Sequence, residues 1–327
     1  FGSSGTLWSR GTCLLAGYPR AFWIYSSLSM SLADWLKDNG ANDKELDRVA
    51  FTSRWVAAER GLESSRPDAL VVDPFAKVLG GNSGLAFSET MATKFGDLYG
   101  WRDMHRCWMA VRTKALDNAI TRFAESIGNS PFQMVNLGAG LDTRAFRLDK
   151  LANCSVCFEV DMPEVLKAKD LIMSSLKAQS LCPRVAVAAD VTDENFQAKL
   201  FAVGFTTKLP TFWLLEGLIM YLDPDPAKAL LGKLLKLSAP GSQLACGFMG
   251  DPNTKMPEGA PQLPFMSPPE EFGQLVRDLG WKDVRVALFG DPELNFGRYP
   301  ADRPVDPKQC FCFATQSGKD LAPKAKL

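Results

Sequence analysis

The spacing of apolar residues changes near residue 130. Before that point apolar positions recur with a helical period, most clearly in Leu46–Arg60, Phe87–Phe95 and Trp108–Ile127, and this period predicts helices. After it, short and almost continuous apolar runs alternate with helical stretches such as Met162–Leu176 and Asp225–Leu237. The pattern therefore divides the chain into a helical amino-terminal region and an α/β region.

Seven of the short apolar runs are predicted to be strands, and helical stretches separate the first six of them. The seven are Gln133–Leu137, Val156–Val160, Val185–Ala189, Thr211–Leu215, Gln243–Phe248, Val284–Phe289 and Cys310–Thr315. Strands that are apolar on both faces and alternate with helices are typical of a parallel sheet covered on both sides. The predicted fold class is therefore α/β, with a seven-stranded, mostly parallel sheet.

The same pattern predicts four segments. We expect a leader over residues 1–31, a helical cap over 32–130, an α/β core over 131–317 and a tail over 318–327. The core contains two long proline-rich connections, at 250–266 and 290–308. Long connections in a compact domain are often lids or binding loops, so we expect these two to close over a site.

The composition of the leader leaves two interpretations open. Residues 1–33 contain no acid and only two basic side chains, Arg10 and Arg20, beside many serines. This composition permits an organellar transit peptide. The alternative is a disordered or non-native leader ahead of Met30. We expect a cytoplasmic protein, or one of an organelle stroma or matrix if the leader is a transit peptide.

Charge and hydropathy exclude some classes of partner. The chain has 37 basic and 37 acidic residues, 46% apolar residues and no basic field over the whole chain, which argues against nucleic acid or an anionic membrane surface as partner. No stretch reaches the roughly 20 continuous apolar residues of a membrane helix. We therefore expect a small-molecule substrate, or a protein substrate recognised locally.

The eight cysteines are scattered, and only Cys154 and Cys157 form a CxxC. A tetrahedral zinc site of that type needs a second pair at a similar spacing, and the chain has none. Cys157 also lies in an apolar, strand-like run. We therefore expect free, buried thiols and no metal site.

A strand, a glycine turn and a helix-compatible stretch follow one another at residues 132–147. Gly138 and Gly140 have no Cβ, so their backbone can approach a ligand closely. The dinucleotide fingerprint requires a third glycine at position 143, and Thr143 stands there. A glycine pair followed by an acid, Asp142, suits a nucleotide-type cofactor without a pyrophosphate. The commonest such cofactor is S-adenosylmethionine.

Acids also follow the next three predicted strands. Asp161 stands 23 residues beyond Gly138, a spacing suited to an acid that binds both ribose hydroxyls. Asp190 with Val191 follows the third strand, and Glu216 follows the fourth. Ligands of parallel sheets bind outside the carboxyl ends of the strands, so these acids are candidate cofactor contacts. The alternatives are helix caps at Asp161 and Asp190, and a buried arginine partner at Glu216.

Several of these motifs resemble the leucine carboxyl methyltransferase family, and within it the bacterial-type S-adenosyl-L-methionine-dependent methyltransferases. They are Val135–Arg144, Glu159–Pro163, Glu216–Leu222, and the Arg66–Leu70 and Asp73–Ala76 segments. The resemblance runs from about Arg48 to Thr315. It implies a class I methyltransferase fold, a Rossmann-like sheet whose last strand is antiparallel, and S-adenosylmethionine as cofactor.

The resemblance also implies roles for single residues. Arg112 would pair with the methionine carboxylate of the cofactor, and Gly138 would lie beside its amino-acid moiety. Asp161 would bind the ribose, Asp190 and Val191 the adenine, and Glu216 the region of the methionine amino group. Members that methylate a protein phosphatase carry a lysine where this chain has Ser53, which puts the transfer of that protein substrate in doubt.

The chemistry of the acceptor stays open. A carboxylate is already ionised at neutral pH and needs no base, whereas a hydroxyl benefits from one. His105 is the only histidine, and it is either a base or a structural side chain; Tyr221 either touches the acceptor or packs beneath the site. We expect an oxygen acceptor on a small molecule. A protein carboxylate, a nicotinamide-dependent enzyme and a silent cofactor-binding scaffold are the alternatives.

Overall fold

The computed structural model describes residues 48–99, 101–256 and 262–316. The expected leader at 1–31, the first part of the expected cap and the tail at 318–327 lie outside the described residues. Within the described ranges, no helix combines the length and apolar character needed to cross a membrane.

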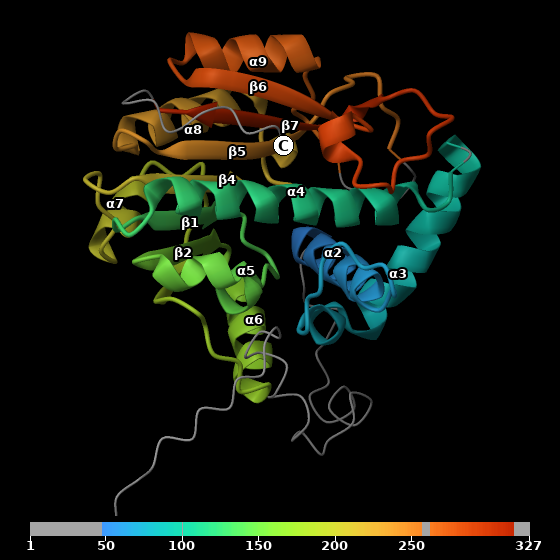
Figure 1. Cartoon of the computed structure of the whole chain (residues 1–327), viewed down its shortest axis with the longest axis horizontal. Coiled ribbons are helices and arrows are strands. Elements are labelled where there is room, and N and C mark those ends of the chain that lie inside the picture. Colours follow the sequence, from blue (N-terminus) through green and yellow to red (C-terminus); the bar gives the residue numbers. More distant parts are fainter. Residues whose placement is uncertain (1–47, 100, 257–261, 317–327) are drawn as a thin grey trace, which may run out of the picture.

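Helices and strands occur in the order expected from the sequence (Figure 1). The helices are α2 (Arg48–Ser64), α3 (Ala76–Tyr99), α4 (Met104–Ile127), α5 (Arg144–Arg147), α6 (Pro163–Ser175), α7 (Phe196–Ala202), α8 (Pro224–Leu237) and α9 (Pro269–Asp278), with short 3-10 turns η2 (Asp149–Asn153), η3 (Ile219–Tyr221) and η4 (Pro292–Leu294). The strands are β1 (Gln133–Leu137), β2 (Val156–Asp161), β3 (Arg184–Ala188), β4 (Thr211–Leu215), β5 (Gln243–Met249), β6 (Lys282–Phe289) and β7 (Asp306–Thr315).

The seven strands form one sheet in the order β3-β2-β1-β4-β5-β7-β6. The first five are parallel to one another, and β7 lies antiparallel between β5 and β6. The expected fold class is confirmed, including the antiparallel last strand. Strand order reverses between β1 and β4, where Leu137 pairs with Leu215. Ligands of such sheets bind beside a reversal of this kind, because the connections on its two sides lead away from each other.

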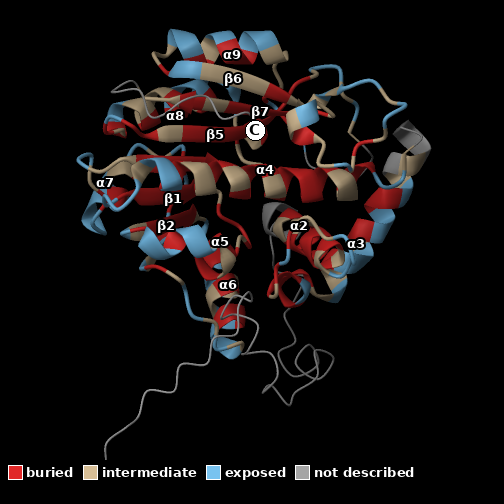
Figure 2. Cartoon of the chain, viewed as in Figure 1, coloured by how far each residue is buried: buried red, intermediate tan, exposed pale blue. Residues whose placement is uncertain are grey.

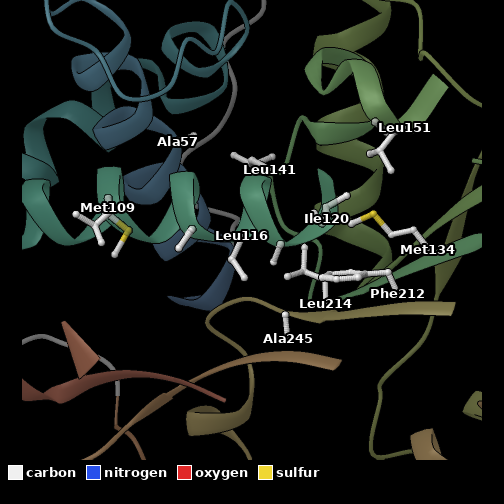
Figure 3. Close-up of a cluster of buried hydrophobic side chains, with 14 of the residues drawn as sticks. Ala57, Met109, Leu116, Ile120, Met134, Leu141, Leu151, Phe212, Leu214 and Ala245 are labelled. Atoms are coloured by element: carbon white, nitrogen blue, oxygen red, sulfur yellow. The ribbon is translucent and has the colours of Figure 1, made fainter. Parts of the chain in front are cut away.

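Each central strand contributes to two cores because side chains alternate between the faces of a sheet. Met134, Phe212 and Leu214 pack in the core on the α4 face, whereas Val135 and Trp213 pack on the face covered by α7, α8 and α9. Figure 2 shows the central strands β1, β4 and β5 and much of α4 as buried. Figure 3 shows side chains of α4 lying over the sheet; those labelled are Met109, Leu116 and Ile120 of the helix and Phe212, Leu214 and Ala245 of β4 and β5. The helix α4 is thus fixed on the sheet by apolar packing along most of its length.

The helix α3 begins at Ala76 rather than at Phe87, where the apolar spacing places it, and it is kinked at Gly81, whose backbone is not helical (φ 60°, ψ −171°). Its first half is rich in glycine, which weakens a helical prediction. Two of these glycines lie against α2: a Cβ on Gly80 would stand 2.7 Å from the backbone of Ala58, and one on Gly84 would stand 2.5 Å from the carbonyl oxygen of Arg54. The glycines therefore allow close packing of α2 and α3, a reason that the sequence alone does not reveal.

Candidate active site

A cavity of about 460 Å³ opens where the sheet reverses its strand order. The walls come from the carboxyl ends of β1 to β4, from α2 and α4, and from the segments around residues 254 and 308. The seven cofactor-binding candidates from the sequence all line it: Arg112, Gly138, Gly140, Asp161, Asp190, Val191 and Glu216. The structure therefore gathers at one cavity residues that are up to 104 positions apart in the sequence.

Both glycines of the turn after β1 have a left-handed backbone, with φ of 65° at Gly138 and 49° at Gly140. Their neighbours also leave little room for a side chain. A Cβ on Gly138 would stand 3.0 Å from Leu218, and one on Gly140 would stand 2.9 Å from Oγ of Ser53. The turn thus requires glycine for its own conformation and for contact with α2, in addition to any approach of a ligand.

Asp161 is directed at the glycine turn. Its Oδ2 accepts a hydrogen bond of 2.6 Å from the backbone N–H of Gly140, and its Oδ1 accepts one of 2.7 Å from Met162. Burial raises the pKa of Asp161, and these two N–H groups oppose the rise. The helix-cap interpretation is wrong here, because α6 has no side-chain cap bond at its start. The carboxylate instead joins the ends of β1 and β2.

Asp190 and Val191 line the cavity just after the end of β3. Oδ1 of Asp190 accepts hydrogen bonds from N and Oγ1 of Thr192, at 2.8 and 2.7 Å, so the side chain closes a local turn. It caps no helix, because α7 begins only at Phe196. Val191 is buried.

Glu216 is held between two arginines. Its Oε1 accepts from Nε of Arg112 at 2.8 Å, and its Oε2 accepts from Nη1 of Arg144 at 2.5 Å. Burial raises the pKa of Glu216, but the two guanidinium groups outweigh burial and lower it overall. The interpretation of Glu216 as a buried arginine partner is therefore confirmed. Arg112 binds Glu216 through Nε alone. Within the described residues, neither of the terminal nitrogens of Arg112 donates a hydrogen bond.

The pair belongs to a larger buried ion network under the glycine turn. Arg144 also donates to Asp117, at 2.6 Å, and to Asp142, while Arg147 binds the second oxygen of Asp117 at 2.6 Å. At its far end Asp73 accepts from Arg60 and from Thr143. Four arginines face four carboxylates, so the charges of the network cancel: Arg60, Arg112, Arg144 and Arg147 with Asp73, Asp117, Asp142 and Glu216.

Sequence reasoning missed most of this network. Asp142, Arg144 and Asp73 stand inside motifs that the sequence singled out, but Asp117 lies mid-helix with no local signal. Buried charges need partners, and here the partners come from α2, α4 and the β1 turn. Only their meeting in space shows that these side chains form one unit.

The other end of the cavity is apolar. The rings of Trp55 and Trp108 and the side chains of Met104 and Met109 line it from α2 and α4. Tyr221 lines it from η3, and burial raises the pKa of its hydroxyl, which is hydrogen-bonded to Thr52. This end therefore offers flat, apolar surface with few polar groups.

Both expected lid segments contribute to the cavity wall. Thr254, Met256 and Leu263 come from the first, and Asp306 and Lys308 come from the end of the second. Residues 257–261 of the first lie outside the described residues. The second is tied to the amino-terminal helices: Nη2 of Arg298 binds Glu63 at 2.8 Å, and its Nη1 binds Asp68 at 2.8 Å. Whether these segments open and close stays a prediction.

The CxxC acquires a third cysteine in the structure. Cys154 and Cys157 both interact with Cys182, which precedes β3, and all three are buried and free. Among the described residues no group of three or more His, Cys, Asp or Glu side chains is arranged to hold a metal ion.

Comparison with known proteins bears on this geometry. The family model for leucine carboxyl methyltransferase matches residues 53–235, which include every residue of the glycine turn and the ion network. A protein of Parafrankia sp. named "Putative S-adenosyl-L-methionine-dependent methyltransferase" is 35% identical over 244 residues, 75% of each chain. A relative of the same name from Mycobacterium marinum is 39% identical over 219 residues, which cover 66% of this chain and 71% of the relative.

Two crystal structures have a similar fold. One, titled a "putative methyltransferase" from Thermobifida fusca, has a TM-score of 0.55 at 17% identity and covers 81% of this chain and 94% of its own. The other, a DUF574 family protein from Streptomyces avermitilis, has a TM-score of 0.54 at 14% identity and covers 81% and 97%. The extent of the family match and the identity to the relatives make the chain a member of the leucine carboxyl methyltransferase family.

Proposed function

We propose that this enzyme transfers a methyl group from S-adenosyl-L-methionine to an oxygen atom, of a carboxylate or a hydroxyl, on a small molecule. The coarser statement, that the chain is an S-adenosyl-L-methionine-dependent methyltransferase, follows from its family. The observation that carries the finer proposal is the division of the cavity into a charged end at the glycine turn and an apolar end under α2 and α4.

The charged end fits the cofactor. The ion network beneath it is electrically balanced, so an added carboxylate needs a donor that the network does not use. The terminal nitrogens of Arg112 are such donors, because only Nε binds Glu216. Asp161 would take the ribose hydroxyls, and Asp190 with Val191 would flank the adenine. Gly138 and Gly140 would let the backbone approach the amino-acid moiety.

Bound S-adenosylmethionine supplies a methyl group that its sulfonium already activates. The protein has to hold the acceptor oxygen in line with that methyl, roughly 3–3.5 Å away, and to exclude water. The apolar end provides a dry wall for this purpose. Trp55 and Trp108 are both buried there.

Two features favour a small acceptor. The cavity volume of about 460 Å³ lies within the range of roughly 300–1,000 Å³ of small-molecule sites. Ser53 packs against Gly140, at the position where the phosphatase-methylating members of the family have a lysine. A protein carboxyl terminus is the second candidate acceptor, because residues of both expected lid segments line the cavity and would border an entering chain end.

Cofactor choice is tested by isothermal titration. We expect S-adenosylmethionine and S-adenosylhomocysteine to bind and NAD to bind much more weakly, because Thr143 stands where the dinucleotide fingerprint has glycine. Tight NAD binding without an adenosylmethionine signal would overturn the proposal.

The acceptor is tested with tritiated cofactor and cell extract, split into small molecules and proteins. We expect label in the small-molecule fraction, on oxygen. An ester loses its label in mild base, whereas an ether keeps it. Label found only on amine nitrogen, or no transfer by a protein that binds the cofactor, would contradict the oxygen assignment; the second result would favour a silent scaffold.

A further inference from the structure

His105 lies in the wall of the apolar end of the cavity. It is the only histidine of the chain, and its ring stacks on Trp55 with centroids 3.7 Å apart and planes inclined by 16°. The stacking fixes the plane of the imidazole. A histidine placed in a cavity wall and held by its neighbours is in a position to act on a ligand in that cavity.

A buried carboxylate stands behind this histidine. Nδ1 of His105 lies 3.6 Å from Oε1 of Glu59, whose side chain is 1% exposed. The same oxygen accepts hydrogen bonds from Nε1 of Trp55 at 2.9 Å and from Oγ of Ser88 at 2.8 Å. These bonds hold Glu59 in place, and they lower the pKa of its carboxyl together with His105, against the effect of burial. Glu59 is therefore an anion behind the ring.

The protonation state suits a base. Burial lowers the pKa of His105, and the anion of Glu59 opposes this without cancelling it. The imidazole is accordingly neutral at neutral pH, and an imidazolium formed during a reaction has a counter-ion at once. Among the described residues, several charged or titratable groups face it from α2 and α4 or share its cavity from η3 and β7: Glu59, Arg60, Arg106, Arg112, Tyr221, Asp306 and Lys308.

The helix α4 sets the distance between the two ends of the cavity. His105 and Arg112 are seven residues apart on one face of α4, which corresponds to about 10 Å along the axis. If Arg112 holds the carboxylate of the cofactor, His105 would lie about two turns of α4 away from that carboxylate, in the wall of the same cavity. Trp108 and Met109 lie between them and line the same cavity.

We propose that His105 is the general base of the transfer, with Glu59 as its positioning residue, and that the acceptor is an aromatic hydroxyl. This rests on the proposed function and selects the hydroxyl over the carboxylate. The acceptor O–H gives its proton to Nε2 of His105 while its oxygen forms a bond to the methyl carbon. The carbon–sulfur bond breaks, and its electron pair stays on sulfur. The imidazolium releases the proton to water when the products leave.

The choice of an aromatic hydroxyl follows from acidity and shape. A carboxylate is already ionised at neutral pH, so it has no proton for a base to remove. A phenol resembles tyrosine, with a pKa of about 10, and can pass its proton to a neutral imidazole as the new bond forms. The walls offered by Trp55, Trp108 and Met104 also suit a flat apolar ring.

The first test reads the protonation of His105 directly by NMR of protein labelled at histidine, where one residue gives one set of signals. We expect a pKa below 6.5, with the proton of the neutral ring on Nδ1. Glu59→Gln should lower this pKa further, because the anion that favours the imidazolium is gone. Glu125→Gln, at an exposed glutamate that pairs with Lys150 near the other end of α4, is the matched control and should leave it unchanged.

The second test measures methylation of two probes, phenol and 4-nitrophenol, at pH 8. Phenol needs a base there, whereas 4-nitrophenol is largely ionised. We expect His105→Asn to slow methylation of phenol by roughly 10²–10⁴-fold and that of 4-nitrophenol by less than about tenfold. Glu59→Gln should show the same selectivity to a smaller degree. Binding of S-adenosylhomocysteine should survive in both variants.

The outcomes separate this inference from the proposed function. Three results would overturn the assignment of His105 and leave the methyltransferase activity unaffected. The first is equal slowing of both phenols in His105→Asn, and the second is a pKa of His105 above 6.5 in the wild type. The third is methylation of 3-phenylpropanoate but of neither phenol. Failure of the wild-type protein to bind S-adenosylhomocysteine would contradict the proposed function itself. If His105→Asn does not fold, the NMR titration of the wild-type and Glu59→Gln proteins decides the question.

Discussion

The two ends of the cavity are built in different ways. The charged end consists of short loops that follow neighbouring strands, and its side chains are tied to one another by ion pairs such as Glu216 with Arg112 and Arg144. The apolar end consists of one face each of α2 and α4 with segments from near residues 254 and 308, and it holds a single histidine–glutamate pair. The charged end is held together by balanced ion pairs, whereas the apolar end is defined by the shape of the packed helix faces.

The difference shows how one site can combine a common part with a specific part. The carboxyl ends of parallel strands meet at one edge of the sheet, so a cofactor site there depends mainly on the few residues that follow each strand. Helix faces and lid segments can change without disturbing the sheet. We therefore expect substitutions at the charged end to affect stability and cofactor binding, and those at the apolar end to affect the acceptor.

The largest expected effect is on folding, at the charged end. Arg144→Met removes the cation shared by Asp117, Asp142 and Glu216, and leaving buried carboxylates without a partner costs about 3–5 kcal/mol. Arg102→Met is the matched control, because Arg102 makes an exposed pair with a cost of about 0–1 kcal/mol. The measurement is the free energy of unfolding in urea. Equal costs for the two variants would mean that the network is not a structural unit.

The next effect concerns the cofactor carboxylate. Arg112→Lys should weaken S-adenosylhomocysteine by about 1.5–3 kcal/mol, because a lysine cannot bind Glu216 and a second carboxylate in one plane. Binding of 5′-methylthioadenosine, which lacks the amino-acid moiety, is the control and should change little. Calorimetry on both ligands distinguishes the cases. Equal losses would place Arg112 away from the carboxylate.

A comparable or smaller effect is expected at Asp161. Asp161→Ala should weaken S-adenosylhomocysteine by about 1–3 kcal/mol while the protein stays folded. Asp149→Ala removes an exposed carboxylate outside the cavity wall and serves as the control. Unchanged affinity in a folded Asp161→Ala protein would leave Asp161 as a purely structural link to Gly140.

The smallest effect separates the two ends by pH. The pKa of His105 is lowered from 6.5, so the unfolded chain takes up this proton first as the pH falls, and stability declines below about pH 6.5. At the charged end the pKa of Asp73 and of Glu216 is lowered, so their contribution is lost only at more acidic pH, below the ordinary values of 3.8 and 4.5. Unfolding measured from pH 8 to 5 should show the first decline in the wild type and not in His105→Gln. A wild type that gains stability over the His105→Gln protein toward pH 5 would contradict the lowered pKa.

Apolar periodicity and local residue spacing were sufficient to predict the strands of the sheet and the acids that line the charged end of the cavity. The bounds of β1 and β4 agree with the predicted runs, because buried central strands must be apolar on both faces. The acids after the strands reach one cavity because parallel strands share an edge. These features follow from short stretches of chain.

Contacts between distant segments were decided by packing. Nothing near Asp117 in the sequence indicates that it binds Arg144 and Arg147, and nothing near His105 indicates Glu59 behind its ring. The glycines of α3 weaken a helical prediction until α2 is seen lying against them. A buried ion pair or a close helix contact depends on the distance in space between residues of different elements. The order of residues along the chain does not give that distance.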